Sequence, residues 1–202
     1  MNNTNDKLPL ILYHDLIESI VAALEAKDIY TANHSRRVSD MVEKTCIVLG
    51  LSDYETLIIH IAAHVHDIGK IGVPDYILVK PDKLTKKEWE SIREHPQIGA
   101  SILSKSNGLS SIANIVLHHH ERWDGKGYPD GLHKTNIPFG ARIIAICDSI
   151  DAMMSKRPYR QTITSEECQL EIKQNVGLMY DPTIAQAVLD NWDTIVIPIQ
   201  FS

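Results

Sequence analysis

The sequence predicts an all-α protein, a single-domain helical bundle. Apolar residues recur at helical spacing through most of the chain, as in the run Ile11, Leu12, Leu16, Ile20, Val21 and Leu24. Ser or Thr followed three residues later by Glu, the pattern of a helix-capping box, marks a helix start at Ser52, Thr85 and Thr164. The segment TIVIPIQ near the C-terminus is the one stretch that we expect to be extended.

The expected helices lie, in chain order, at about residues 10–27, 30–50, 52–67, 85–95, 110–121 and 139–154, and from residues 164 and 181 onward. Gly50 is suited to a left-handed stop after the second of them. Pro182 directly after Asp181 is favourable at the first position of the last helix. Two loops rich in glycine and proline, residues 69–84 and 123–138, interrupt the helical pattern, and the absence of a linker favours one domain.

Composition excludes several function classes. With a formal net charge of −6, the 202-residue chain has no overall basic surface for a nucleic-acid duplex. The polar start MNNTNDK is unlike a signal peptide, and no apolar run is long enough to insert into a membrane. Three scattered cysteines argue against a disulfide framework and fit a reducing cytoplasm, where we expect the protein to act.

The ten histidines are not evenly spread along the chain. Residue types that bind metals stand at or near expected helix ends and loops: His34, His66, Asp67, His95, His119 and His120. Asp148 lies within an otherwise apolar helix, where a metal ion or a salt bridge to an arginine would explain a carboxylate. Any one histidine alone is best explained as a hydrogen-bonded core residue, but the segments together favour a metal site.

Residues 118–120 are three consecutive histidines. Successive residues of a helix point about 100° apart, so at most two neighbours of the three can converge on one site. The remaining histidine is then packed or solvated. We expect His14, His60 and His64 to be structural.

Four ordered motifs carry a resemblance to a known family: VHDIGKIGVPDYIL, REHP, HHERWDGKGYP and ARIIAICDSIDAMMSKRPYR. Together they resemble the HD-GYP family, the branch of the HD metal-dependent phosphohydrolases that degrades cyclic di-GMP in bacteria. The resemblance runs from about Asp28 to Tyr180. It implies an HD-type helical bundle with the two loops over a metal site. Residues 28–192 would then form the catalytic domain, after an N-terminal tail and first helix (1–27) and before a C-terminal tail (193–202).

The resemblance also implies a site. Its metal ligands fall on His34, His66, Asp67, His95, His119, His120 and Asp148, with His118 left out. Asp67 would bridge two divalent ions, iron or manganese by the resemblance, with zinc or nickel as alternatives. Asp67 and Lys70 would be the catalytic pair, with Lys70 on the substrate phosphate. The substrate pocket would also include Asp28, Asp151, Arg157 and Arg160.

One position departs from the family pattern. Some members carry a glutamate one helical turn before the first ligand histidine, where it supports a third metal ion, and this chain has Tyr30 there. A tyrosine phenol, with an ordinary pKa of about 10, is a poor ligand at neutral pH. We therefore expect two metal ions.

The expected activity is hydrolysis of cyclic di-GMP to pGpG by a hydroxide bridging two metal ions, and a further step to GMP stays open. The loop residues Gly127, Tyr128 and Pro129 are expected to be mainly structural, with a further role in docking a signalling protein. Two alternatives stay open: a catalytically weak receptor or adaptor, and a phosphodiesterase for another cyclic dinucleotide such as cGAMP, or for a mononucleotide. A homodimer through the first helix is also open.

Overall fold

The computed structural model describes residues 16–25, 33–155 and 162–196, and within these ranges it contains helices and no strand. The all-α prediction is therefore confirmed for this part of the chain. Residues 16–25 are helical and are followed by helices of eight residues or more: α2 (His34–Val48), α3 (Asp53–His64), α6 (His95–Leu103), α7 (Ser110–Leu117), α8 (Phe139–Met154), α9 (Ser165–Gln174) and α10 (Pro182–Asp190). Shorter turns of helix connect them: η1 (Ile68–Gly72), α4 (Asp75–Leu78), α5 (Lys86–Ile92), η2 (Asn107–Leu109), η3 (Lys134–Asn136) and α11 (Trp192–Ile195).

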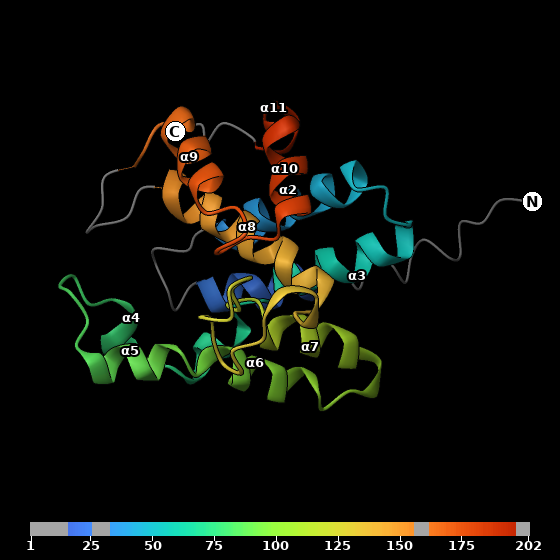
Figure 1. Ribbon diagram of the computed structural model, residues 1–202. Coiled ribbons are helices and arrows are strands. Elements are labelled where there is room, and N and C mark those ends of the chain that lie inside the picture. Colours follow the sequence, from blue (N-terminus) through green and yellow to red (C-terminus); the bar gives the residue numbers. More distant parts are fainter. Residues whose placement is uncertain (1–15, 26–32, 156–161, 197–202) are drawn as a thin grey trace, which may run out of the picture.

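Helix α8 occupies the middle of the bundle. Figure 1 shows it between α9 and α10 on one side and α6 and α7 on the other. It packs on α2, and α2 packs in turn on α3, while α6 packs on α7 and on η1. Because the core is built between these helices, the ends of α3, α5 and α7 and the middle of α8 all face one region of the bundle.

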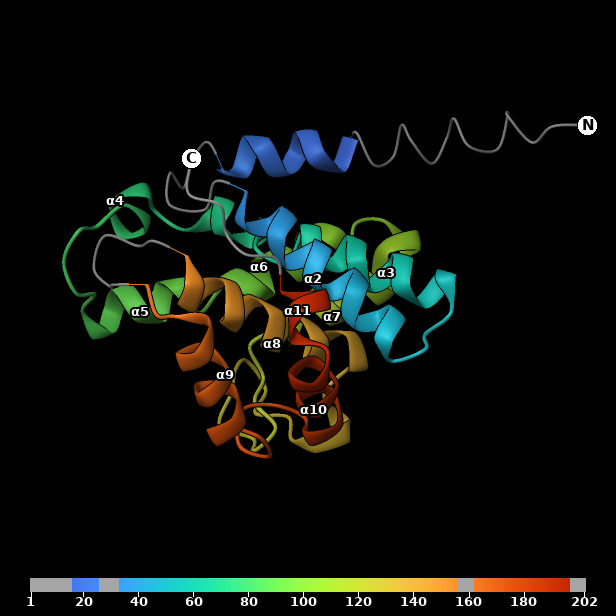
Figure 2. The ribbon, with the colours of Figure 1, turned by 90° about the horizontal axis from the view of Figure 1, so that it is seen from above.

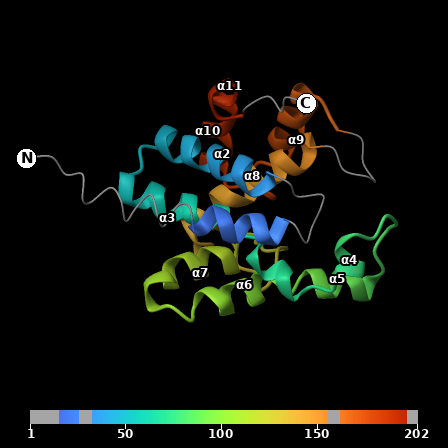
Figure 3. The same cartoon turned by 180° about the vertical axis from the view of Figure 1, so that it is seen from behind.

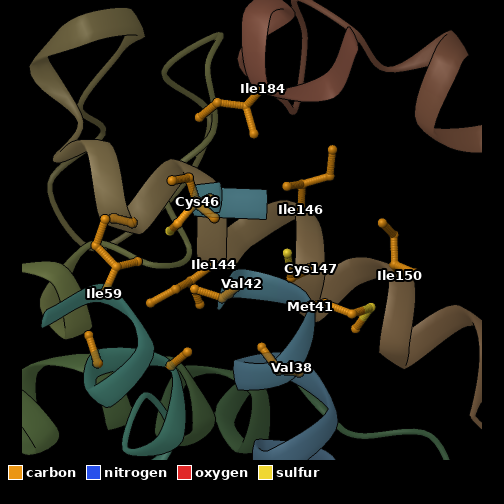
Figure 4. Packing of buried hydrophobic residues seen from close by; sticks show 14 of the residues in the cluster. Val38, Met41, Val42, Cys46, Ile59, Ile144, Ile146, Cys147, Ile150 and Ile184 are labelled. Atoms are coloured by element: carbon orange, nitrogen blue, oxygen red, sulfur yellow. The ribbon is translucent and has the colours of Figure 1, made fainter. Parts of the chain in front are cut away.

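The core is aliphatic. Val38 and Val42 of α2 face Ile144 of α8, and Ile59 of α3 lies beside them (Figure 4). None of these side chains is more than 6% exposed. Each fully buried aliphatic side chain contributes roughly 1.5–3 kcal/mol relative to an exposed one, so this cluster holds the helix ends in fixed relative positions.

Local sequence signals set the helix starts. All three capping boxes are present, with Ser52, Thr85 and Thr164 each accepting a hydrogen bond from the backbone N–H of the glutamate three residues on. The Asp181 carboxylate caps α10 through the N–H groups of Thr183 and Ile184. Gly50 adopts the expected left-handed conformation, with φ of 72°.

Helix ends differ from the sequence-based expectation. Helix α3 ends at His64 and α7 at Leu117, several residues before the expected ends at 67 and 121. The prediction of an extended segment near the C-terminus is wrong for Thr194 and Ile195, which belong to α11, whereas Val196 after them has extended backbone angles. The expected boundary at residue 193 falls inside this helix, whose Ile195 is completely buried against the core. Apolar burial here outweighs the strand preference of the β-branched residues.

Two parts extend from the bundle. Helices α4 and α5 form an arm, with a small apolar cluster of its own around Val73, Ile77 and Leu78 (Figure 2). The helix of residues 16–25 runs along the outside of the bundle (Figure 3), where the Glu18 carboxylate lies 3.5 Å from His64 Nδ1. In the described part of the chain, no helix combines the length and apolarity needed to cross a membrane.

Gly69 permits the contact between η1 and α6 on which the site depends. A Cβ atom at this position would lie 1.8 Å from the His95 carbonyl oxygen and 2.6 Å from the Gly99 backbone nitrogen. We expect Gly69→Ala to lower the free energy of unfolding by about 3 kcal/mol, since backbone atoms cannot move aside as a flexible side chain can. Urea denaturation measures this effect. The control is Gly108→Ala, where the nearest atom would be a Ser106 oxygen at 3.8 Å; an equal loss in both variants would contradict the prediction.

Candidate metal centre

The structure brings all seven predicted metal ligands together from separate elements. They are His34 at the start of α2, His66 and Asp67 after α3, His95 at the start of α6, His119 and His120 after α7, and Asp148 within α8. Their ligand atoms form overlapping groups, each within 4.8 Å: His34, His66 and Asp148; His95, His119 and His120; and His66, Asp67 and His119.

Asp67 lies between the two outer groups. Its Oδ2 atom is 3.5 Å from His66 Nε2 and 3.9 Å from His34 Nε2. Its Oδ1 atom is 3.4 Å from His95 Nε2 on the other side. One carboxylate oxygen therefore faces each group, which is the arrangement that a carboxylate needs to bridge two ions.

Three of the histidines are oriented in the same way by helix ends. The Nδ1–H groups of His66, His95 and His119 each donate to the carbonyl three residues earlier, at 2.7, 2.7 and 2.6 Å. Those carbonyls belong to the last turns of α3, α5 and α7, where no intrahelical N–H is available to them. Because a carbonyl can only accept, Nδ1 carries the proton and Nε2 presents its lone pair to the site.

Burial keeps the imidazoles of His95, His119 and His120 in the neutral form that binds metals. His119 and His120 are enclosed, and burial together with neighbouring histidines holds the pKa of His119 well below its usual value and lowers the pKa of His120 to about 3. Burial also lowers the pKa of His95. All three are therefore neutral at pH 7, as a metal-binding imidazole must be.

The two carboxylates are ionised in spite of burial. Burial alone would raise the pKa of Asp67, but the Lys70 ammonium and nearby histidines outweigh it and hold the pKa well below the usual range. For Asp148 the hydrogen bond and the charge of His34 have the same effect, and its pKa is also strongly lowered. Imidazoles beside ionised carboxylates are ligand types that fit divalent transition-metal ions.

His118 turns away from the centre. Its Nδ1–H donates to the Asn114 carbonyl at 2.9 Å, and its Nε2 lies 3.0 Å from Asp130 Oδ2. The run of histidines lies in a turn after α7 and not on the helix itself. His119 and His120 face the site, in keeping with the assignment that the resemblance implied.

Asp151 occupies a different position from the one expected of a substrate contact. It is 2% exposed, and its carboxylate accepts hydrogen bonds from His34 Nδ1 at 2.6 Å and from Arg37 Nε at 2.5 Å. Both carboxylate oxygens thus accept hydrogen bonds, one from His34 and one from Arg37. Burial by itself would lower the pKa of His34, but Asp148 and Asp151 outweigh it and raise the pKa to about 9. Asp151 therefore orients His34.

Lys70 lies beside the bridging carboxylate. It is part of η1, and its Nζ atom is 2.6 Å from Asp67 Oδ2. Its side chain is 18% exposed, so the ammonium is at the edge of the centre and reaches both the carboxylate and the surface. The contact of Lys70 with a substrate phosphate, which the resemblance implied, stays a prediction.

The Gly-Tyr-Pro loop closes over His120. A Cβ atom on Gly127 would lie 2.4 Å from the Arg122 nitrogen and the Glu121 Cα, so only glycine fits there. The Tyr128 N–H donates to the His120 carbonyl at 3.2 Å, and the two rings pack with centroids 4.8 Å apart. Tyr128 is thus a packing partner of a metal ligand. The expected docking role of the loop stays a prediction.

Sequence reasoning missed two arginines at the site. Arg37 pairs with Asp151 beneath His34, and the Arg93 guanidinium lies 5.0 Å from the centroid of the Tyr128 ring. Neither belongs to a residue pattern with an obvious chemistry. The proximity of Arg93 to His95 in REHP was the available signal. Five positions singled out from the sequence lie outside the described residues: His14, Asp28, Tyr30, Arg157 and Arg160.

Fold and site together define a helical protein with a histidine- and aspartate-rich cluster that could hold metal ions. A family model described as HD domain matches residues 18–184. The chain belongs to this family, in its HD-GYP branch.

Curated relatives share substantial sequence identity with the chain. A cyclic di-GMP phosphodiesterase of Thermotoga maritima is 42% identical over 88% of this chain and 50% of the relative. The cyclic di-GMP phosphodiesterase response regulator RpfG of Xanthomonas campestris is 40% identical over 87% of this chain and 47% of the relative. The 3'3'-cGAMP-specific phosphodiesterase 2 of Vibrio cholerae is 36% identical over 90% of this chain and 35% of the relative. The chain thus spans half or less of the length of these relatives.

Solved structures share the fold. A cyclic GMP-AMP specific phosphodiesterase of V. cholerae (V-cGAP3) superposes with a TM-score of 0.65 at 17% identity, covering 88% of this chain and 49% of the other. Bd1817, a HDG"Y"P protein from Bdellovibrio bacteriovorus, gives a TM-score of 0.64 at 20% identity, covering 82% of this chain and 53% of the other.

Proposed function

We propose that the protein is a metal-dependent cyclic di-GMP phosphodiesterase, which hydrolyses the cyclic dinucleotide to pGpG and further to GMP. The observation that carries the proposal is the position of Asp67, with one carboxylate oxygen facing each of two ligand groups. The relatives named as cyclic di-GMP phosphodiesterases support the substrate.

Two divalent ions would be held by the seven residues. His34, His66 and Asp148 would hold one, His95, His119 and His120 the other, and Asp67 would hold both. Such ions would supply Lewis-acid charge to a phosphodiester and to the attacking water. We propose iron or manganese, with zinc or nickel as alternatives, since mixed imidazole and carboxylate ligands suit all of them.

The chain's own residues would position and neutralise the substrate. The Lys70 ammonium, which lies 2.6 Å from Asp67 Oδ2, would donate a hydrogen bond to a non-bridging phosphate oxygen and would there offset the charge that develops during attack. Asp151 keeps the His34 ring in place, and Tyr128 covers the His120 ring. A cluster of local positive charge would thus attract a dianionic substrate to a chain whose net charge is −6.

A second candidate substrate is 3′,3′-cGAMP. V. cholerae relatives that are named as specific for this dinucleotide are 36% identical to the chain, close to the identity of the cyclic di-GMP enzymes. The two substrates differ in one base and share the phosphodiester that the centre would attack. The metal centre therefore does not distinguish them.

The first experiment is anaerobic purification, metal analysis and incubation with cyclic di-GMP and 3′,3′-cGAMP in parallel. We expect two metal ions per chain and turnover of cyclic di-GMP to pGpG, followed by GMP. Faster turnover of 3′,3′-cGAMP would favour the second candidate. Bound metal with dinucleotide binding but no turnover would favour a receptor, and three tightly bound ions would contradict the binuclear centre.

A further inference from the structure

We propose that Arg93 is a substrate-binding residue, whose guanidinium binds the phosphate of the cyclic dinucleotide that is not being cleaved. The inference rests on the proposed function of the metal centre. It assigns a role to a residue outside the seven metal ligands and outside the substrate contacts expected from the sequence.

Tyr128 connects Arg93 to the metal centre. Arg93 caps the C-terminus of α5, two residues before the ligand His95. Its Cζ atom lies 5.0 Å from the Tyr128 ring centroid, and the Tyr128 ring packs on His120 at 4.8 Å with an interplanar angle of 30°. A single aromatic ring thus separates this cation from a metal ligand. The cation therefore lies at the rim of the centre.

Arg93 differs from the other cations around the centre in having no carboxylate partner among the described residues. Arg37 pairs with Asp151, Arg122 with Asp124 and Lys70 with Asp67. The Arg93 side chain is also exposed. Its charge and its N–H donors therefore remain available to an anion.

The chemistry of the substrate gives such a cation a role. A cyclic dinucleotide carries two phosphodiesters, and the metal centre with Lys70 can neutralise the one that is cleaved. The second negative charge then lies at the rim, on a protein with a net charge of −6. A guanidinium is planar and binds phosphate through two parallel hydrogen bonds. The contact of the guanidinium with the Tyr128 ring, 5.0 Å from Cζ to the centroid, does not use the N–H donors.

The test is Arg93→Ala with two substrates. For cyclic di-GMP we expect KM to rise about 10- to 100-fold, the range expected for a lost charge-assisted hydrogen bond, with kcat changed less than KM. Bis(p-nitrophenyl) phosphate has only one phosphodiester. The ratio of kcat/KM for cyclic di-GMP to kcat/KM for this compound should therefore fall about tenfold or more. Arg93→Lys should give an intermediate KM, because it keeps the charge and loses the paired donors.

Lys126→Ala is the matched control, since Lys126 lies in the same loop as Tyr128, is 78% exposed and carries the same charge as Arg93. Its KM should equal that of the parent. An unchanged KM for Arg93→Ala would overturn the inference. An equal loss of kcat/KM for both substrates, together with loss of metal, would also overturn it, because it would show that Arg93 only supports Tyr128.

Failure of the proposed function is a separate result. If the parent binds cyclic di-GMP without turnover, the dissociation constant from calorimetry replaces KM. Weaker binding by Arg93→Ala, with Lys126→Ala unchanged, then supports the inference. If the parent neither binds nor hydrolyses any cyclic dinucleotide, the substrate contact fails together with the proposed function.

Discussion

Replacing His66 and Asp67 together with alanine is expected to remove both the bound metal and the phosphodiesterase activity. The pair supplies ligands to both halves of the centre, because Asp67 faces His34 and His66 with one oxygen and His95 with the other. We expect turnover to fall about 1,000-fold or more, since metal ions contribute several kcal/mol to such reactions and about 1.4 kcal/mol corresponds to tenfold in rate. Metal analysis and product chromatography on the same preparation measure both effects.

His118→Ala is the control for this variant. His118 belongs to the same histidine-rich chain segment as His119 and His120 but contacts Asn114 and Asp130 outside the centre. We expect its metal content and turnover to match those of the parent, with a loss of about 1 kcal/mol in the free energy of unfolding. A His118→Ala protein that lost its metal, or a double variant that kept both metal and activity, would contradict the assignment of the metal ligands.

Replacing Asp151 with alanine is expected to weaken metal binding about 10- to 100-fold, as is typical when the partner that orients a ligand histidine is lost. The variant leaves His34 Nδ1 and Arg37 Nε without their shared carboxylate, so the His34 ring is no longer held toward Asp148. Competition with a chelator measures the affinity. If Asp151 were a substrate contact, KM would rise while metal affinity stayed the same.

Two further variants test whether the charge of Asp151 acts on His34. Asp151→Asn keeps an oxygen that can accept from His34 Nδ1 but loses the charge. In the metal-free protein, burial lowers the pKa of His34, but Asp148 and Asp151 outweigh burial and raise this pKa to about 9. Loss of the Asp151 charge should therefore bring the pKa of His34 down toward its ordinary value. A proton titration by NMR measures this shift. Ser155→Ala is the control, since Ser155 donates to Asp151 at 3.1 Å without touching His34.

Local signals in the sequence were sufficient for the class of fold and for most helix starts. A capping box such as Ser52 with Glu55 involves residues within one turn, so its structure does not depend on the rest of the chain. Helix ends were harder to predict. The apolar pattern continues past His64 with Val65 and Ile68, and no glycine or proline directly follows Leu117, yet the helix ends at both residues.

For the metal centre, too, the residue types could be predicted from the sequence but their arrangement in space could not. The residue types at 34, 66, 67, 95, 119, 120 and 148, and the resemblance of their motifs to a known family, were enough to predict the metal ligands. Their convergence depends on the packing of α2, α3, α7 and α8, which periodicity does not specify. The role of Asp151 also depends on that packing, because an acid in an apolar helix can face substrate, a metal or a buried arginine with equal plausibility from sequence.

The sequence alone therefore determined the helical class and the family, because these depend on local pattern and on residue chemistry, and the metal ligands stay its prediction. Only the tertiary structure decided that Asp67 lies between two ligand groups, that Asp151 orients His34, and that Tyr128 separates Arg93 from His120. The physical reason is that each of these contacts joins residues from different helices or loops. Their distances are set by the shared core and by close backbone approaches such as that of Gly69 to His95.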